Sequence, residues 1–119
     1  MKSDLPGRTF EFAKQIVRLC QDLDCSPGAP RTLANQLLRS GTSIGANVEE
    51  GQASQSEADF VSKYSIACKE ARETHYWLRL ISATDLLDAA LLKPHVDECN
   101  ELIAILTSIV VKIRAKNKV

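Results

Sequence analysis

The chain has 119 residues, of which 45% are hydrophobic and 25% charged, and its 15 basic and 15 acidic residues give a formal net charge of zero. This length supports one domain over residues 1–119, and the neutral charge excludes a whole-molecule field that draws a protein to nucleic acid or to an acidic membrane. No apolar run reaches the length of about eighteen residues that a membrane helix needs, and no signal peptide is recognisable, so we expect a cytoplasmic protein with no membrane partner.

The first predicted helix covers about 9–24. Pro6 and Gly7 favour a loose lead-in before it, and Thr9 is a suitable N-cap. The apolar residues that recur at helical spacing are Phe12, Ile16, Leu19, Cys20 and Leu23. Residues 24–30, DCSPGAP, then predict a turn, because two prolines and a glycine end most helices.

A second helix is expected over about 31–53, although each glycine inside a helix costs about 1 kcal/mol relative to alanine. The positions that keep the helical period are Leu33, Leu37, Gly41, Ile44 and Val48. The third helix is expected over about 57–83, with Ser56 as its N-cap and Asp59 completing a variant of the capping box. Its predicted buried face contains Phe60, Tyr64, Ala67, Ala71, Leu78 and Ile81.

Small residues recur one turn apart on both of these helices. Gly41 and Gly45 would let a neighbouring backbone come close, and Ala67 with Ala71 would match them from the third helix. We therefore predict helix packing through these four residues. The alternative is that the glycines are only tolerated in a weak surface helix.

The fourth helix is expected over about 93–115, with Pro94 in its first turn, where the missing N–H does no harm. The connection before it, residues 84–93, can contain a turn capped by Asp85 or Asp88. The apolar stripe of this helix contains Val96, Cys99, Leu102, Ile103, Leu106, Ile109, Val110 and Ile113. Such a face is wider than three partner helices need, which favours self-association.

Four helices with short connections predict an all-α, antiparallel up-and-down four-helix bundle. No strand pattern of comparable strength competes with it. The cysteines, at positions 20, 25, 68 and 99, have neither zinc-finger nor CxxC spacing, so free thiols in a reduced interior are favoured.

Enzymatic motifs are missing from the sequence. It contains no GxSxG elbow, no GxxxxGK[ST] loop and no GxGxxG after a strand. His95 and Glu98 have a useful separation for a metal, but in reversed order and only once, whereas Glu73 and His75 cannot share a helix face. We therefore predict no enzyme, metal, cofactor or small-molecule substrate.

Two groups of charged residues leave alternatives open. Glu49, Glu50, Glu70 and Glu73 can form a carboxylate cluster, but ion pairs with Arg39, Lys69, Arg72 or Arg79 are favoured. At the C-terminus, Lys112, Arg114, Lys116 and Lys118 follow the last acidic residue, Glu101. These cations either stabilise the negative end of a helix dipole or, in an oligomer, form a rim that binds polyanions.

Two adjacent stretches resemble a known family. SGTSIGANVEEG, Ser40 to Gly51, and SEADFVSKYSIACKEARETHYWLRLI, Ser56 to Ile81, are similar to the bacterial 23S rRNA intervening sequence proteins, also called S23-like proteins. The most specific matches are Ala46-Asn47, Glu50-Gly51, Phe60 and the run from Lys69 to Leu80. The resemblance implies a four-helix bundle that assembles as a ring, commonly a homopentamer.

A related branch of proteins, the accessory proteins of diversity-generating retroelements, forms pentamers that bind a reverse transcriptase and nucleic acid through a basic surface. The present chain departs from that branch in its neutral charge. Many family members also have proline where this sequence has Gly45, a departure that bears on the bend of the second helix.

Three functional hypotheses follow. The first is a non-enzymatic oligomeric scaffold or adaptor, with RNA or a ribonucleoprotein as a possible partner. The second is direct nucleic-acid binding through the C-terminal lysines and arginines of the oligomer. The third, an enzyme, has no supporting group of residues.

Overall fold

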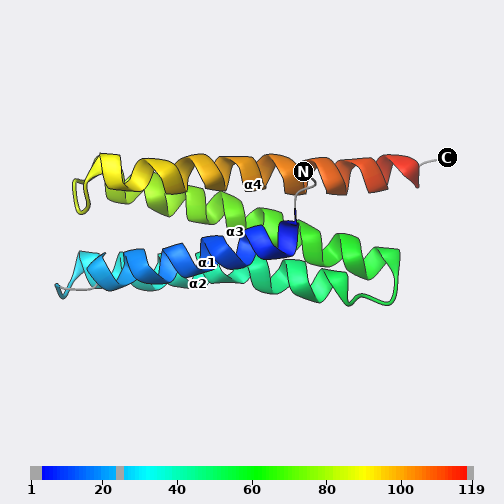
Figure 1. The fold of residues 1–119 in the computed structure, drawn as a ribbon, viewed down its shortest axis with the longest axis horizontal. Helices are drawn as coiled ribbons and strands as arrows, with labels where there is room; N and C mark the ends of the chain where they lie inside the picture. Colours follow the sequence, from blue (N-terminus) through cyan, green and yellow to red (C-terminus); the bar gives the residue numbers. More distant parts are fainter. Residues whose placement is uncertain (1–3, 24–25, 118–119) are drawn as a thin grey trace.

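The computed structural model describes residues 4–23 and 26–117. Its four helices are α1 Leu5–Leu23, α2 Ala29–Gln52, α3 Glu57–Ala83 and α4 Ala89–Lys116, and no strand occurs among the described residues. Each helix runs antiparallel to the one before it (Figure 1), in a shape with extents of 52 × 26 × 22 Å. The all-α prediction of four helices is therefore confirmed.

Helix α1 begins four residues earlier than the predicted cap. Thr9 is fully buried inside the helix, and its Oγ1 donates to the backbone oxygens of Leu5 and Pro6, so its prediction as N-cap is wrong. Asp4 takes that role, since its Oδ1 accepts a hydrogen bond from the backbone N–H of Gly7 at 3.2 Å. Pro6 fits because the N–H groups of a first turn have no partner inside the helix. The predicted end at residue 24 lies outside the described residues.

Helix α2 begins at Ala29 instead of near residue 31. Pro30 lies in its first turn, where it continues the helix instead of ending the loop. Gly28 precedes the helix with φ of 88°, a left-handed conformation that favours glycine. The predicted turn over residues 24–30 is therefore too long, because Ala29 and Pro30 already belong to α2.

Helix α3 has the predicted bounds and the predicted cap. The Oγ of Ser56 accepts a hydrogen bond from the backbone N–H of Asp59 at 3.0 Å. Gly51, near the end of α2, gives room for the next helix, because a Cβ at this position would lie 2.6 Å from Cε1 of Tyr64. The Tyr64 hydroxyl in turn accepts a hydrogen bond from Gln52 at 2.6 Å.

Helix α4 begins at Ala89, four residues before the predicted start. Asp88 caps it by accepting a hydrogen bond from the backbone N–H of Ala90 at 3.2 Å. Pro94 consequently lies inside the helix and not in its first turn. The added turn keeps Leu92 fully buried, a gain that offsets the hydrogen bond that proline cannot make.

The helices pack mainly with their neighbours in sequence. Helix α2 lies against α1 and α3, and α3 lies against α4, whereas α1 and α4 approach each other at few places. The core is mostly aliphatic, and its largest members include Ile16, Leu37, Ile44, Tyr64, Leu78, Leu102 and Leu106. Helix α1 is the shortest of the four helices. The C-terminal part of α4 therefore extends beyond the first turn of α1 (Figure 1).

Candidate functional site

The two glycines predicted to receive α3 lie against α1 instead. A Cβ added to Gly41 would come within 2.7 Å of Cγ2 of Ile16, and one added to Gly45 would come within 3.2 Å of the backbone oxygen of Thr9. Close packing, and not mere tolerance in a surface helix, therefore explains both glycines. The expected pairing of these glycines with Ala67 and Ala71 is wrong, since α1 occupies the space in front of them.

The two alanines of α3 are fully buried, and Ala71 lies close to α4. The Sγ of Cys99 donates to the backbone oxygen of Ala71 at 3.2 Å, a contact that the small alanine side chain permits. Ala67 is likewise fully buried. Ala71 thus lies at the contact between α3 and α4, whereas the two glycines lie at the contact between α1 and α2.

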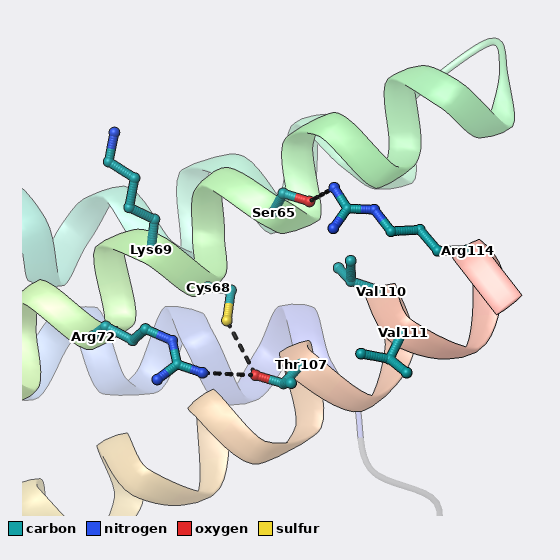
Figure 2. A pocket seen from close by; sticks show the side chains of 8 residues that line it. All are labelled: Ser65, Cys68, Lys69, Arg72, Thr107, Val110, Val111 and Arg114. Carbon is teal, nitrogen blue, oxygen red and sulfur yellow. Dashed lines mark hydrogen bonds between the residues drawn. The ribbon is translucent and has the colours of Figure 1, made fainter.

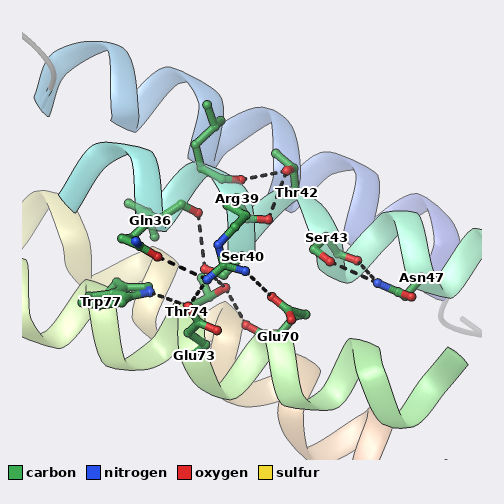
Figure 3. A network of polar contacts seen from close by, with 12 residues as sticks. Gln36, Arg39, Ser40, Thr42, Ser43, Asn47, Glu70, Glu73, Thr74 and Trp77 are labelled. Carbon is green, nitrogen blue, oxygen red and sulfur yellow. Dashed lines mark hydrogen bonds and ion pairs between the residues drawn. The ribbon is translucent and has the colours of Figure 1, made fainter. Parts of the chain in front are cut away.

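The contact between α2 and α3 contains a buried pair of hydroxyl groups (Figure 3). Thr74 Oγ1 lies 2.9 Å from Ser40 Oγ and 2.7 Å from the backbone oxygen of Glu70, and both side chains are fully buried. Ser40 Oγ also reaches the backbone oxygen of Leu37 at 3.5 Å. These contacts satisfy polar groups that would be costly to bury alone.

Beside this pair, Arg39 gathers the acidic residues of α3. Its guanidinium forms ion pairs with Glu70 and Glu73, and Glu73 also accepts a hydrogen bond from the indole N–H of Trp77 (Figure 3). Glu50 pairs instead with Lys63 at 3.0 Å. The structure therefore favours ion pairs over a carboxylate cluster, although the partner of Glu50 was not among those predicted.

A second arginine joins the first and last helices. Arg8 of α1 binds Glu98 of α4 through two hydrogen bonds, Nη2 to Oε1 at 2.6 Å and Nε to Oε2 at 3.0 Å, and it reaches Glu101 at 2.9 Å. The hydrogen bond to Glu98 is the main cause that raises the pKa of Arg8 above its usual value. Since α1 and α4 share few other contacts, this pair fixes one helix against the other.

The described histidine and cysteine side chains make contacts that are typical of structural residues. No group of three or more His, Cys, Asp or Glu side chains suited to a metal occurs in residues 4–23 and 26–117. Burial lowers the pKa of both His95 and His75. Burial also raises the pKa of the Cys99 thiol to about 12, which keeps it protonated. The Sγ of Cys20 donates to the backbone oxygen of Ala34 at 3.3 Å, and Cys25 lies outside the described residues.

Two of the described C-terminal cations bind side chains of α3. Lys116 pairs with Glu57 at 2.9 Å, and Arg114 donates to Ser65 Oγ at 3.2 Å. Lys112 is exposed, and Lys118 lies outside the described residues. Lys116 and Arg114 therefore bind the N-terminal part of α3.

A groove of about 320 Å³ runs between α3 and α4 (Figure 2). Its lining residues are Ser65, Cys68, Lys69 and Arg72 from α3 and Thr107, Val110, Val111 and Arg114 from α4. Sequence reasoning missed it, although both sets repeat at steps of three, one and three and so mark one face of each helix. Only the packing of the two helices brings these faces together.

The comparisons with known proteins agree with this fold. The chain matches the 23S rRNA-intervening sequence protein family over residues 2–108. It belongs to this family. Among solved structures, a protein of unknown function from the S23 ribosomal protein family of Bacteroides thetaiotaomicron VPI-5482 is 38% identical, with a TM-score of 0.82. The match covers 89% of the present chain and 97% of that chain.

No curated protein matches this chain. Neither the family description nor that of the solved relative names an enzymatic activity. Within the described residues, none of the helices combines the length and hydrophobicity needed to cross a membrane.

Proposed function

We propose that this family member is a non-enzymatic, cytoplasmic scaffold or adaptor that works as a homo-oligomer. The observation that carries this proposal is an exposed apolar patch on α1 and α2, which we call the α1–α2 patch: Phe10, Val17 and Leu38. Their exposed fractions are 60%, 40% and 38%. Phe10 and Val17 lie two turns apart on one face of α1, and Val17 shares a shallow groove with Leu38. Large apolar side chains exposed on one side of a molecule are typical of a surface that a protein partner covers.

An exposed apolar residue of α4 supports a head-to-tail arrangement. Leu91 of α4 is 46% exposed, and Figure 1 places α4 on the opposite side of the molecule from the pair α1 and α2. Contacts between two different surfaces generate a ring when the rotation closes. We propose such a ring, and the resemblance to the family favours five subunits. In a scaffold of this kind an RNA or a protein would bind to the assembled surface.

The proposal is tested by changing the α1–α2 patch. Phe10→Lys and Val17→Glu place charges at exposed positions, so the monomer should keep its helical circular dichroism while the molar mass from light scattering falls. Gln55→Lys, in the connection between α2 and α3, adds the same charge as Phe10→Lys and should leave the mass unchanged. An unaltered mass in both patch variants would exclude this surface as the interface.

A second proposal is direct nucleic-acid binding through the C-terminal cations. It has one supporting observation: Lys112 and Arg114 form no ion pair with any carboxylate that the structure describes. Truncation after Ile113 removes Arg114, Lys116 and Lys118, so it should weaken RNA binding and flatten its salt dependence. An RNA affinity that ignores both salt and this truncation would contradict the second proposal.

A further inference from the structure

The groove between α3 and α4 carries positive charge without a compensating carboxylate. Lys69, Arg72 and Arg114 line it, and no acidic residue is among its lining side chains. None of the three forms an ion pair with a described carboxylate. Several other cations are paired with carboxylates, namely Arg8, Lys14, Arg39, Lys63, Lys93 and Lys116.

The two guanidinium groups lie at opposite ends of the groove (Figure 2). Arg72 Nη2 donates to Thr107 Oγ1 at 3.4 Å, and Arg114 Nη2 donates to Ser65 Oγ at 3.2 Å. Each of these guanidiniums has five N–H donors, so most of its donors remain available to a ligand. Lys69 projects from α3 on the side of Arg72, with its ammonium group directed away from α4 (Figure 2).

The floor between the charged ends is apolar. Val110 is nearly buried, whereas Val111 remains 58% exposed beside it. The Cys68 thiol lies half-buried in the same groove, 3.2 Å from Thr107 Oγ1. A ligand can therefore rest a nonpolar part on the valines while its charged groups reach the arginines.

The spacing of the cations indicates the class of ligand. Lining residues Ser65 and Arg72 are seven positions apart on α3, a separation of roughly 10 Å along a helix. Each strand of a double helix carries one negative charge per about 3.4 Å of axial rise, and the two phosphates needed here can also come from a more extended strand within that length. Guanidinium groups match phosphate geometry, and hydroxyl groups add further donors. Carboxylate side chains seldom reach such a charge density.

We propose that the α3–α4 groove binds the phosphates of a nucleotide ligand, with Arg72 and Arg114 each holding a phosphate and Val111 contacting a base or sugar. A nucleoside triphosphate and a short single strand present the same chemistry. This binding site shares Arg114 with the C-terminal rim, but it also depends on Lys69 and Arg72 of α3. It does not depend on the homo-oligomer proposed above.

The test uses the full chain and two probes, ATP and an eight-nucleotide single-stranded RNA. Affinity is measured by calorimetry, and alkylation of Cys68 is followed by mass spectrometry of the peptide that contains it. We expect at least one probe to bind and to slow Cys68 alkylation at least fivefold, and the probe that does so identifies the source of the phosphates. The triple variant Lys69→Gln, Arg72→Gln, Arg114→Gln should lose at least tenfold in affinity.

A matched triple variant controls for net charge. Lys14→Gln, Arg18→Gln and Lys93→Gln remove the same three charges outside the groove and should change the affinity less than threefold. The proposal is overturned if neither probe slows Cys68 alkylation, if both triple variants lose affinity equally, or if a hexaglutamate peptide protects Cys68 as well as the probes do. Protection of Cys68 without any probe, lost when the oligomer is diluted to monomers, would show instead that another copy covers the groove.

Discussion

Gly41 of α2 faces Ile16 of α1 so closely that a Cβ at the glycine would lie 2.7 Å from Cγ2 of the isoleucine. Ile16 is fully buried, so it has little freedom to move away. Gly41 therefore lowers the helix propensity of α2, but it permits the close approach of α1 and α2.

Gly41→Ala should destabilise the protein. Alanine contributes about 1 kcal/mol in helix propensity, but the clash with Ile16 costs about 1–3 kcal/mol, so we expect a net loss of about 1 kcal/mol in the free energy of unfolding. Urea denaturation measures this change. In an Ile16→Ala background the clash is gone, and Gly41→Ala should then stabilise. Stabilisation in the wild-type background would mean that α1 does not pack against this glycine.

The ion pair between Arg8 and Glu98 should contribute measurably to stability. Glu98→Gln removes the charge from a two-bond contact between partly buried side chains, and we expect a loss of about 1–2 kcal/mol. Glu11→Gln removes the exposed pair with Lys14 and should cost clearly less than Glu98→Gln, because solvent screens an exposed pair. Equal losses in the two variants, measured by urea denaturation, would show that Arg8 does not hold α1 to α4.

Alkylation should distinguish the cysteines. Burial raises the pKa of the Cys99 thiol to about 12, so its thiolate fraction at pH 8 should be far lower than in the unfolded chain. Iodoacetamide labelling followed by peptide mapping should show Cys99 modified only after denaturation. Rapid native labelling of Cys99 would contradict its position against Ala71.

Acid should lower stability through the histidines. Burial lowers the folded-state pKa of His75 and His95 below 6.5, so the unfolded chain binds protons first as the pH falls. The free energy of unfolding should thus be constant above about pH 7.5 and decline below pH 6.5. His95→Gln should reduce this decline when stability is compared at pH 7.5 and 5.5. A stability that rises between pH 6.5 and 5.5 would have the wrong sign.

Local signals in the sequence predicted much of the fold. Ser56 and Asp59 defined the start of α3 because a cap depends on neighbouring residues alone. The predicted start of α4 is four residues too late because Pro94 was placed in the first turn. Burial of Leu92 favours an earlier start, after the cap Asp88. A single proline indicates a first turn only when no better cap precedes it.

The sequence could not predict which helix packs against the glycines of α2, nor the groove between α3 and α4. Helix α2 has two neighbours, and the spacing of Gly41 and Gly45 is the same whichever helix approaches them. Likewise Arg72 and Arg114 share a groove only because α3 and α4 pack in one particular register. Such relationships depend on tertiary structure, which periodicity along one helix does not encode.

Sedimentation equilibrium of the wild-type protein tests the central claim, self-association through the exposed apolar surfaces, most directly. The chain mass is 13.1 kDa. We predict a mass several times larger that stays constant as the protein is diluted through the micromolar range, as a closed ring requires. A single species at the chain mass across that range would contradict the claim.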